Sequence, residues 1–178
     1  MVCLAPRAQE DSVRPRRPSD VVVRPLNFTV REHGVGSAMI KKVGSTVILE
    51  KHRARCHCGA VVLELSLPNG IVDPHRCNCS ICRRKGAVVA SVPLTGLRVV
   101  EGDEVLMLYQ FNTMTAKHYF CSRCGIYTHH RRRSNPNEYS YNLACLDGVD
   151  PFEMGEVPVS DGVHHSADRL PNNRWTGP

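Results

Sequence analysis

The sequence lacks the long apolar runs that mark membrane spans and export signals. No stretch of about 18 apolar residues occurs in the 178 residues, and a helix needs about that length to cross a bilayer. The opening residues, MVCLAPRAQEDSVRPRR, also lack the continuous apolar segment of a signal peptide. We therefore expect a cytoplasmic protein that does not contact a membrane.

Most of the chain has no excess of positive charge. The net charge is +6, but it is confined to the N-terminal part. Residues 1–55 carry 11 Lys/Arg and 5 Asp/Glu, whereas residues 56–178 carry 12 of each. A neutral C-terminal part argues against nucleic acid as its partner. Residues 1–44, whose first 38 residues include four prolines and six arginines, are predicted to be a basic, flexible N-terminal extension.

Helical patterns are also scarce, and short β-type segments follow one another instead. Turn residues separate these segments at intervals of about 8–12 residues, which is typical of all-β folds. The only clear helix start follows Cys79. We predict an all-β fold with few or no helices, a domain over residues 45–170 and a tail over 171–178. The expected strands lie within residues 45–50, 60–67, 87–94, 97–100, 105–112, 116–120, 126–130 and 138–146.

Cysteine, in contrast, is abundant. The chain has nine cysteines, and an odd number without an export signal argues against a disulfide framework. Seven of them form three groups, whereas Cys3 and Cys145 stand alone. Clustered thiols in a reducing compartment most often bind metal. The three groups are Cys56-x-Cys58, Cys77-x-Cys79-x-x-Cys82 and Cys121-x-x-Cys124.

Seven sulfurs divide most naturally into four plus three. The first and last groups together form a four-cysteine site that zinc closes tetrahedrally, so that metal binding contributes to folding. In that site Gly125, directly after Cys124, gives a zinc-knuckle turn its backbone freedom. The predicted structural zinc ligands are Cys56, Cys58, Cys121 and Cys124.

The middle group leaves three sulfurs on a loop of six residues, and the fourth position has two interpretations. In the first, another side chain closes a structural site; the candidates are His75, His57, His118 and Cys145. In the second, the position is open, as in catalytic zinc sites, and a soft, sulfur-rich site then favours an incoming thiol. Such a thiol would be held as the nucleophilic thiolate.

Three sequence segments carry a resemblance to a known family. The order RCHCGAVVLEL, RCNCSICRRKG and HYFCSRCGIYTHH resembles the glutathione-dependent formaldehyde-activating enzymes, or S-(hydroxymethyl)glutathione synthases, from about Arg55 to about Asp168. The resemblance implies a zinc-stabilised β-tent fold and two zinc ions per chain. It also implies a carbon–sulfur lyase that adds the glutathione thiol to formaldehyde or a related aldehyde. By the same resemblance, Cys77, Cys79 and Cys82 bind the catalytic zinc.

Part of the same sequence resembles another branch of the family. The segments FCSRCG, RSNPN and CLD resemble the branch that contains centromere protein V, which is associated with chromosomes and microtubules. A shared fold does not dictate a shared activity. The alternative function is therefore a non-catalytic, two-zinc module that binds a macromolecular partner through its basic extension, and a third possibility is a purely structural zinc protein.

Basic residues follow both the second and third cysteine groups. Arg83, Arg84 and Lys85 are candidates for binding the two carboxylates of glutathione, with Arg83 and Arg84 preferred and a solvated basic turn as the alternative. Residues 131–133 are three arginines that raise the same choice. His129 and His130 are adjacent on an expected strand and point to opposite faces, so we predict that they are not metal ligands.

Overall fold

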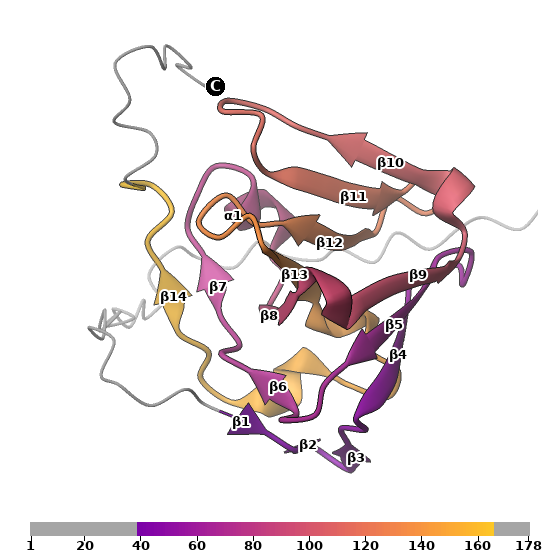
Figure 1. The fold of residues 1–178 in the computed structure, drawn as a ribbon. Helices are drawn as coiled ribbons and strands as arrows, with labels where there is room; N and C mark the ends of the chain where they lie inside the picture. The colour runs from indigo at the N-terminus through magenta and orange to yellow at the C-terminus, as the bar shows by residue number, and fades with distance from the viewer. Residues whose placement is uncertain (1–38, 166–178) are drawn as a thin grey trace, which may run out of the picture.

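The computed structural model describes residues 39–165, and two sheets dominate it (Figure 1). The larger sheet has five antiparallel strands in the order β10-β11-β12-β13-β8. The smaller has three antiparallel strands in the order β4-β5-β9. The bounds are β10 Leu106–Tyr109, β11 Lys117–Cys121, β12 Tyr127–Arg131, β13 Glu138–Asn142, β8 Val89–Pro93, β4 Lys51–Arg55, β5 Val62–Ser66 and β9 Leu97–Glu101.

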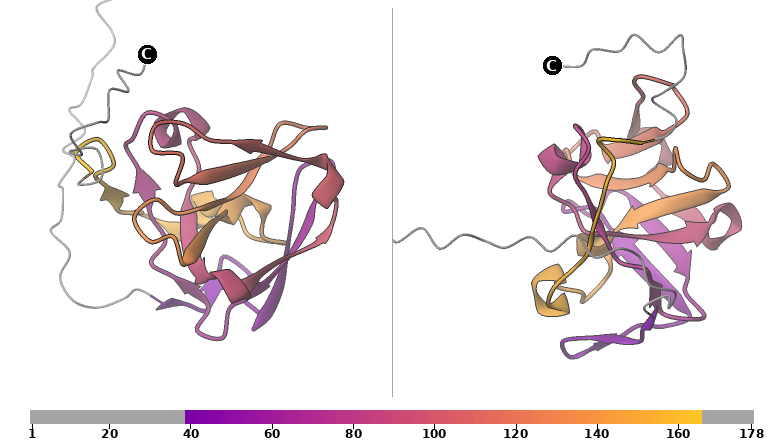
Figure 2. Two further views of the ribbon diagram at one scale, coloured as in Figure 1. Left: turned by 45° about the horizontal axis from the view of Figure 1, so that its top comes forward. Right: turned by 90° about the vertical axis from the view of Figure 1, so that its left-hand side faces the viewer.

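Three short strand pairs complete the sheet structure. Two are antiparallel, and the pair β7–β14 is parallel and joins residues more than 80 positions apart. Figure 2 shows β14 running alongside β7 at one side of the molecule. The pairs are β1 (Met39–Ile40) with β6 (Ile71–Val72), β2 (Lys42–Val43) with β3 (Thr46–Val47), and β7 (Arg76–Cys77) with β14 (Val159–Ser160).

Helical structure is limited to single turns. Within residues 39–165 the one α-helix, α1, spans Cys82–Lys85 and ends at Gly86, whose φ is 64°. Four 3-10 turns accompany it, and no helix in this part of the chain has the length and apolar character needed to cross a bilayer. Cytoplasmic location stays a prediction. The 3-10 turns are η2 (Leu94–Gly96), η3 (Asp103–Val105), η4 (Leu143–Cys145) and η5 (Pro151–Met154).

The core lies where the two sheets meet. Strand β5 contributes Leu63 and Leu65, which are 1% and 0% exposed, and the larger sheet contributes Ala90 and Tyr141 from β8 and β13. Because β5 is the central strand of its sheet, both of its edges are hydrogen-bonded, and Val62, Leu63 and Leu65 along it are buried. The core therefore holds the two sheets together and fixes the segments that carry the cysteines.

The all-β class with few helices is confirmed, but the five-residue strand β4 and several two-residue strands were missed. The expected strand over 45–50 contains only the two residues of β3, and the longer strand is β4 directly after it. In β4 the buried residues are His52 and Ala54, which alternate with exposed Lys and Arg residues. Burial alternates regularly along β4. The strand was not recognised in the sequence because its residues are mostly basic and none is β-branched.

The division into extension, domain and tail stays a prediction. Residues 39–44 of the expected extension contribute β1 and β2. Residues 1–38, Cys3 and the expected tail 171–178 lie outside the described residues.

Candidate metal centres and cavity

The structure gathers the first and third cysteine groups into one four-cysteine cluster. Cys56 and Cys58 follow β4, and the other two cysteines flank the turn between β11 and β12. Cys58 Sγ lies 3.6 Å from Cys56 Sγ and 3.7 Å from Cys121 Sγ. Four sulfurs bonded tetrahedrally to zinc at ~2.3 Å lie ~3.8 Å apart. The spacing of these sulfurs therefore fits a closed zinc site. All four ligand atoms, from Cys56, Cys58, Cys121 and Cys124, lie within 4.8 Å of one another.

Two tight turns shape the four-cysteine cluster. Gly59 and Gly125 follow the second cysteine of each pair and have φ values of 74° and 72°, a region that glycine adopts without strain. The backbone N–H of Ile126 leads the interactions that lower the pKa of Cys124 to about 6. The turns thus direct backbone donors at sulfur and favour the thiolate that a metal requires.

The second cysteine group forms a separate three-cysteine cluster. Cys77 ends β7, Cys82 begins α1, and Cys79 lies between them. Their three sulfurs lie within 4.8 Å of one another, and all three residues are half-buried. Hydrogen bonds from Cys77 and Cys82 lower the pKa of Cys79, and the contact with Cys77 raises the pKa of Cys82. The cluster is a compact group of soft donors that suits a thiophilic metal ion.

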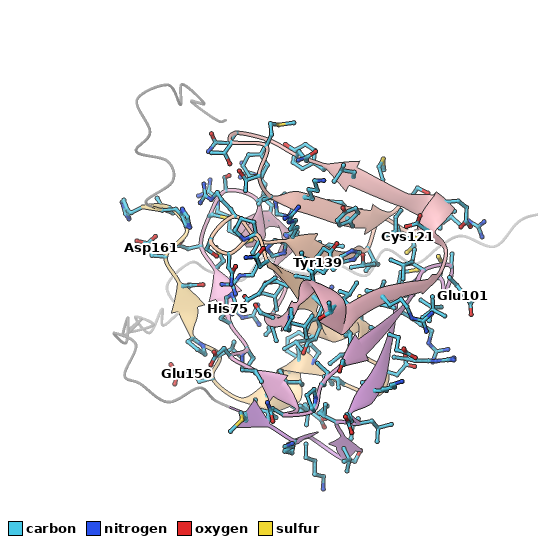
Figure 3. All side chains as sticks on the ribbon, in the orientation of Figure 1. His75, Glu101, Cys121, Tyr139, Glu156 and Asp161 are labelled. Atoms are coloured by element: carbon cyan, nitrogen blue, oxygen red, sulfur yellow. The ribbon has the colours of Figure 1, made fainter. Side chains whose placement is uncertain are left out.

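A segment from the C-terminal end of the described chain passes over this cluster; we call residues 160–165 the strap. Asn78 Oδ1 accepts hydrogen bonds from the backbone N–H of Gly162 at 2.7 Å and of Val163 at 3.1 Å. A Cβ atom at Gly162 would lie only 2.5 Å from Cys77 Sγ. The strap therefore contacts the cysteines so closely that only glycine fits at residue 162. Figure 3 shows Asp161 of the strap on the same side of the fold as His75.

A cavity of about 590 Å³ opens beside the three-cysteine cluster. The strap forms part of its wall, and the ends of β11 and β12 contribute His118 and His130. The loop after β10 contributes Phe111 and Thr113. Residues from three distant parts of the sequence thus surround one cavity, and all three cysteines of the cluster line it. A volume of this size accommodates a small peptide or similar ligand.

The predicted carboxylate-binding arginines differ in their placement. Arg83 is exposed and lines the cavity. Arg84 is also exposed, but its guanidinium donates a hydrogen bond to the Ser80 carbonyl at 2.6 Å. Arg132 and Arg133 line the cavity too, and Arg132 forms an ion pair with Glu138. The binding role of Arg83 and Arg84 stays a prediction.

None of the four candidate side chains closes the three-cysteine cluster. Within residues 39–165, neither His75, His57, His118 nor Cys145 places a ligand atom within 4.8 Å of all three sulfurs. Of these four, only His75 and His118 line the cavity. Cys145 is buried elsewhere and its thiol faces the Tyr127 carbonyl at 3.7 Å.

A polar group behind the three-cysteine cluster was not anticipated from the sequence. Lys85 Nζ lies 3.4 Å from His118 Nδ1 and 3.5 Å from the centroid of the Tyr127 ring. The Tyr127 hydroxyl is 2.5 Å from His130 Nδ1. We call Lys85, His118, Tyr127 and His130 the Lys85 cluster. The sequence groups Lys85 with two arginines as a possible carboxylate ligand or an exposed cation, but the structure places it against His118 and Tyr127 and not in the cavity lining.

Comparisons with known proteins agree with this geometry. The family model described as "Glutathione-dependent formaldehyde-activating enzyme" matches residues 51–157, more than half of the chain. A crystal structure of a Rhodobacter sphaeroides protein is 59% identical in sequence, with a TM-score of 0.59, over 61% of this chain and 99% of that one.

Two curated fungal proteins also match, both named "Putative glutathione-dependent formaldehyde-activating enzyme". The one from Emericella nidulans is 31% identical over 80 residues, and the one from Sordaria macrospora is 33% identical over 84 residues. Each match covers 43% of this chain, but only 40% and 35% of the respective relative. The extent of the family match nevertheless shows the family: this chain belongs to the glutathione-dependent formaldehyde-activating enzyme family.

Proposed function

We propose that this protein is a zinc-dependent carbon–sulfur lyase that joins the thiol of glutathione to formaldehyde or a related small aldehyde. One observation carries the proposal: three sulfurs line a cavity, and no other Cys, His, Asp or Glu within residues 39–165 completes their set. Three protein ligands and an exchangeable fourth position characterise catalytic zinc sites. The four-cysteine cluster, whose ligands are complete, is proposed to hold a second, structural zinc.

The donor atoms suit this assignment. Thiolate sulfur is a preferred ligand of zinc, and a site made of three sulfurs favours a fourth soft ligand. When bound there, zinc would hold the incoming thiol as its thiolate and so supply a nucleophile at neutral pH. The contribution of Cys77, Cys79 and Cys82 is to place that position at the wall of the cavity.

The chain itself supplies binding and orientation. Arg83 is exposed and lines the cavity, so its guanidinium group is proposed to bind a carboxylate of glutathione. Arg132, which is paired with Glu138, and Arg133 add positive charge to the same lining. The strap closes one side and limits how the ligand can lie. Holding both reactants in one small space lowers the entropic part of the barrier. In the reaction the sulfur bonds to the carbonyl carbon, the π electrons move to oxygen, and oxygen takes up the proton that the thiol released.

A non-catalytic binding module is the second candidate. The observation that favours it is the concentration of the net charge of +6 in residues 1–55, outside the cavity-forming strands. A module of this kind would use the same two metal clusters only as structural supports. Its three-cysteine cluster would have no need of an open coordination position, and this difference separates the two candidates.

Cobalt substitution with glutathione titration tests the proposal. Cobalt reports its coordination through sulfur-to-metal absorption, and a thiol that enters the three-cysteine cluster should change that absorption. S-methylglutathione is the matched control, because it keeps both carboxylates but cannot become a thiolate. A shift with glutathione alone is the expected result. An unchanged spectrum at millimolar glutathione would contradict the proposal and favour the binding module.

A further inference from the structure

The Lys85 cluster links α1, which begins at Cys82, to strands β11 and β12 of the large sheet, and the proposed reaction assigns it no role. The Lys85 ammonium stands over the Tyr127 ring at 3.5 Å, a cation–π contact that keeps it on the inner side of α1. From there it reaches His118 Nδ1 at 3.4 Å. Lys85 is not among the residues that line the cavity, whereas His118 is. The ammonium therefore contacts the side of His118 that faces away from the cavity.

The His118 ring is enclosed on its two faces. It stacks on Phe111 with ring centroids 5.9 Å apart and on His130 with centroids 4.9 Å apart. Because β11 lies between β10 and β12, these two rings flank His118 from opposite sides. His118 is only 3% exposed. With both faces covered and Nδ1 occupied, the edge that carries Nε2 is the one left to line the cavity.

The contact with Lys85 determines which ring nitrogen carries the proton. Burial lowers the pKa of Lys85, and the charges of Cys82, Cys79 and Cys77 oppose that shift. As an ammonium group, Lys85 can only donate hydrogen bonds, which makes Nδ1 of His118 the acceptor and places the ring proton on Nε2. Burial, together with the nearby Lys85 charge, lowers the pKa of His118 to about 3. The ring is therefore neutral at physiological pH, and it presents a fixed N–H donor to the cavity.

We propose that His118 is a catalytic hydrogen-bond donor whose Nε2–H stabilises the negative charge that develops on the aldehyde oxygen, and that Lys85 is the positioning residue that fixes this tautomer. This inference rests on the proposed function. As the carbon–sulfur bond forms, the π electrons of the carbonyl group move to oxygen, and a preorganised donor lowers the energy of that charge. His118 keeps its proton throughout, and the oxygen receives from solvent the proton that the thiol released.

The tautomer can be measured without any activity assay. In the metal-loaded full-length protein labelled with 15N-histidine, long-range 1H–15N spectra should show His118 with the proton on Nε2 and an unprotonated Nδ1. Lys85→Met should add a population with the proton on Nδ1. Lys117→Met removes an ammonium from the adjacent residue of β11 and should leave the tautomer unchanged. A proton on Nδ1 of His118 in the unsubstituted protein would overturn the inference, whatever the activity.

Three variants test the catalytic role. The rate is the exchange of 13C label between free formaldehyde and its thiol adduct, above the uncatalysed background. His118→Phe keeps an aromatic ring but removes the donor, and we expect kcat to fall by about 100-fold with unchanged glutathione affinity. His118→Gln retains an N–H near the Nε2 position, and its kcat should be at least about 10-fold higher than that of His118→Phe. His129→Phe is the matched control, since His129 is buried on β12 but does not line the cavity.

The outcomes separate this inference from the proposed function. No thiol-dependent exchange by the unsubstituted protein would overturn the proposed function, and with it the inference. Exchange by the unsubstituted protein that His118→Phe leaves unchanged would overturn only the inference. A His118→Gln variant no faster than His118→Phe would also overturn it, because lost stacking would then explain the defect. Should His118→Phe fail to fold, the tautomer measurement and His118→Gln still decide.

Discussion

The two cysteine clusters are built from the same side chain in opposite ways. The four-cysteine cluster joins two segments 63 residues apart; Cys56 and Cys121 within it are buried, Cys124 is half-buried and Cys58 is exposed. The three-cysteine cluster lies within six consecutive residues, is half-buried and lines a cavity. Figure 3 places Cys121 on the opposite side of the fold from His75 and Asp161, which flank the cavity.

The difference shows how one donor type can serve two purposes. A cluster that links distant segments converts metal affinity into folding free energy, because the unfolded chain has no such site. A cluster within one loop requires little long-range order, so its metal contributes less to the fold. The incomplete ligand set and the adjacent cavity leave the second cluster available for chemistry.

The largest expected effect is the loss of the fold on breaking the four-cysteine cluster. Cys121→Ser should release one metal ion per chain and lower the free energy of unfolding by more than about 4 kcal/mol. Denaturant unfolding and metal analysis measure the two quantities. Cys145→Ser makes the same change at a buried thiol outside both clusters and should cost only about 1 kcal/mol. A Cys121→Ser variant with both metal ions and normal stability would show that the two clusters do not differ as proposed.

Breaking the three-cysteine cluster should have the complementary effect. Cys79→Ser is expected to abolish thiol-dependent formaldehyde exchange while it changes the free energy of unfolding by less than about 1 kcal/mol. The reason is that a metal ion at this cluster is proposed to serve catalysis and would not cross-link distant segments. The formaldehyde exchange rate and the free energy of unfolding, both measured on the same preparation, check the two parts of this prediction. An active Cys79→Ser variant would remove the cluster from the mechanism.

A smaller effect is expected from the strap. Gly162→Ala places a methyl group where Cys77 Sγ is only 2.5 Å away, so the strap must move outward. We expect the dissociation constant for glutathione to rise about 10-fold, equivalent to ~1.4 kcal/mol, as measured by calorimetry. Val159→Ala, at a partly exposed residue of β14 that does not line the cavity, is the control for a substitution in the same region. Equal affinities for both variants would mean that the strap does not shape the binding site.

The effect that is smallest at neutral pH concerns His129 on β12 of the large sheet. Burial lowers the pKa of His129 to about 4, below the value of about 6.5 for an unfolded chain. Between these two values only the unfolded state binds the proton, so stability falls as pH falls, by up to ~1.4 kcal/mol per pH unit. His129→Phe should reduce this slope, as followed by denaturant unfolding between pH 7 and pH 4. An identical slope would mean that His129 is protonated in the folded protein.

Much of the candidate site was predictable because its signals are local. The spacings Cys-x-Cys and Cys-x-x-Cys-Gly are properties of single turns, and the structure brings together the same four and the same three sulfurs. The all-β class was predictable for a similar reason, since turn residues and β-branched runs act over a few positions. Strand β4 was missed because its alternation uses His, Arg and Lys instead of apolar residues.

What depends on distant contacts was not predictable. Arg84 and Lys85 are neighbours of like charge, yet one binds the Ser80 carbonyl at the surface and the other turns toward Tyr127 and His118. Likewise, no neighbouring residue in the sequence indicates that position 162 requires glycine. The requirement comes from the close approach of Cys77, which lies 85 residues earlier. The sequence by itself determined the cysteine groups that could hold metal ions and the fold class, because turn geometry and side-chain period are local. Only the tertiary structure decided the cavity, the strap and the surroundings of His118, because packing between distant segments creates them.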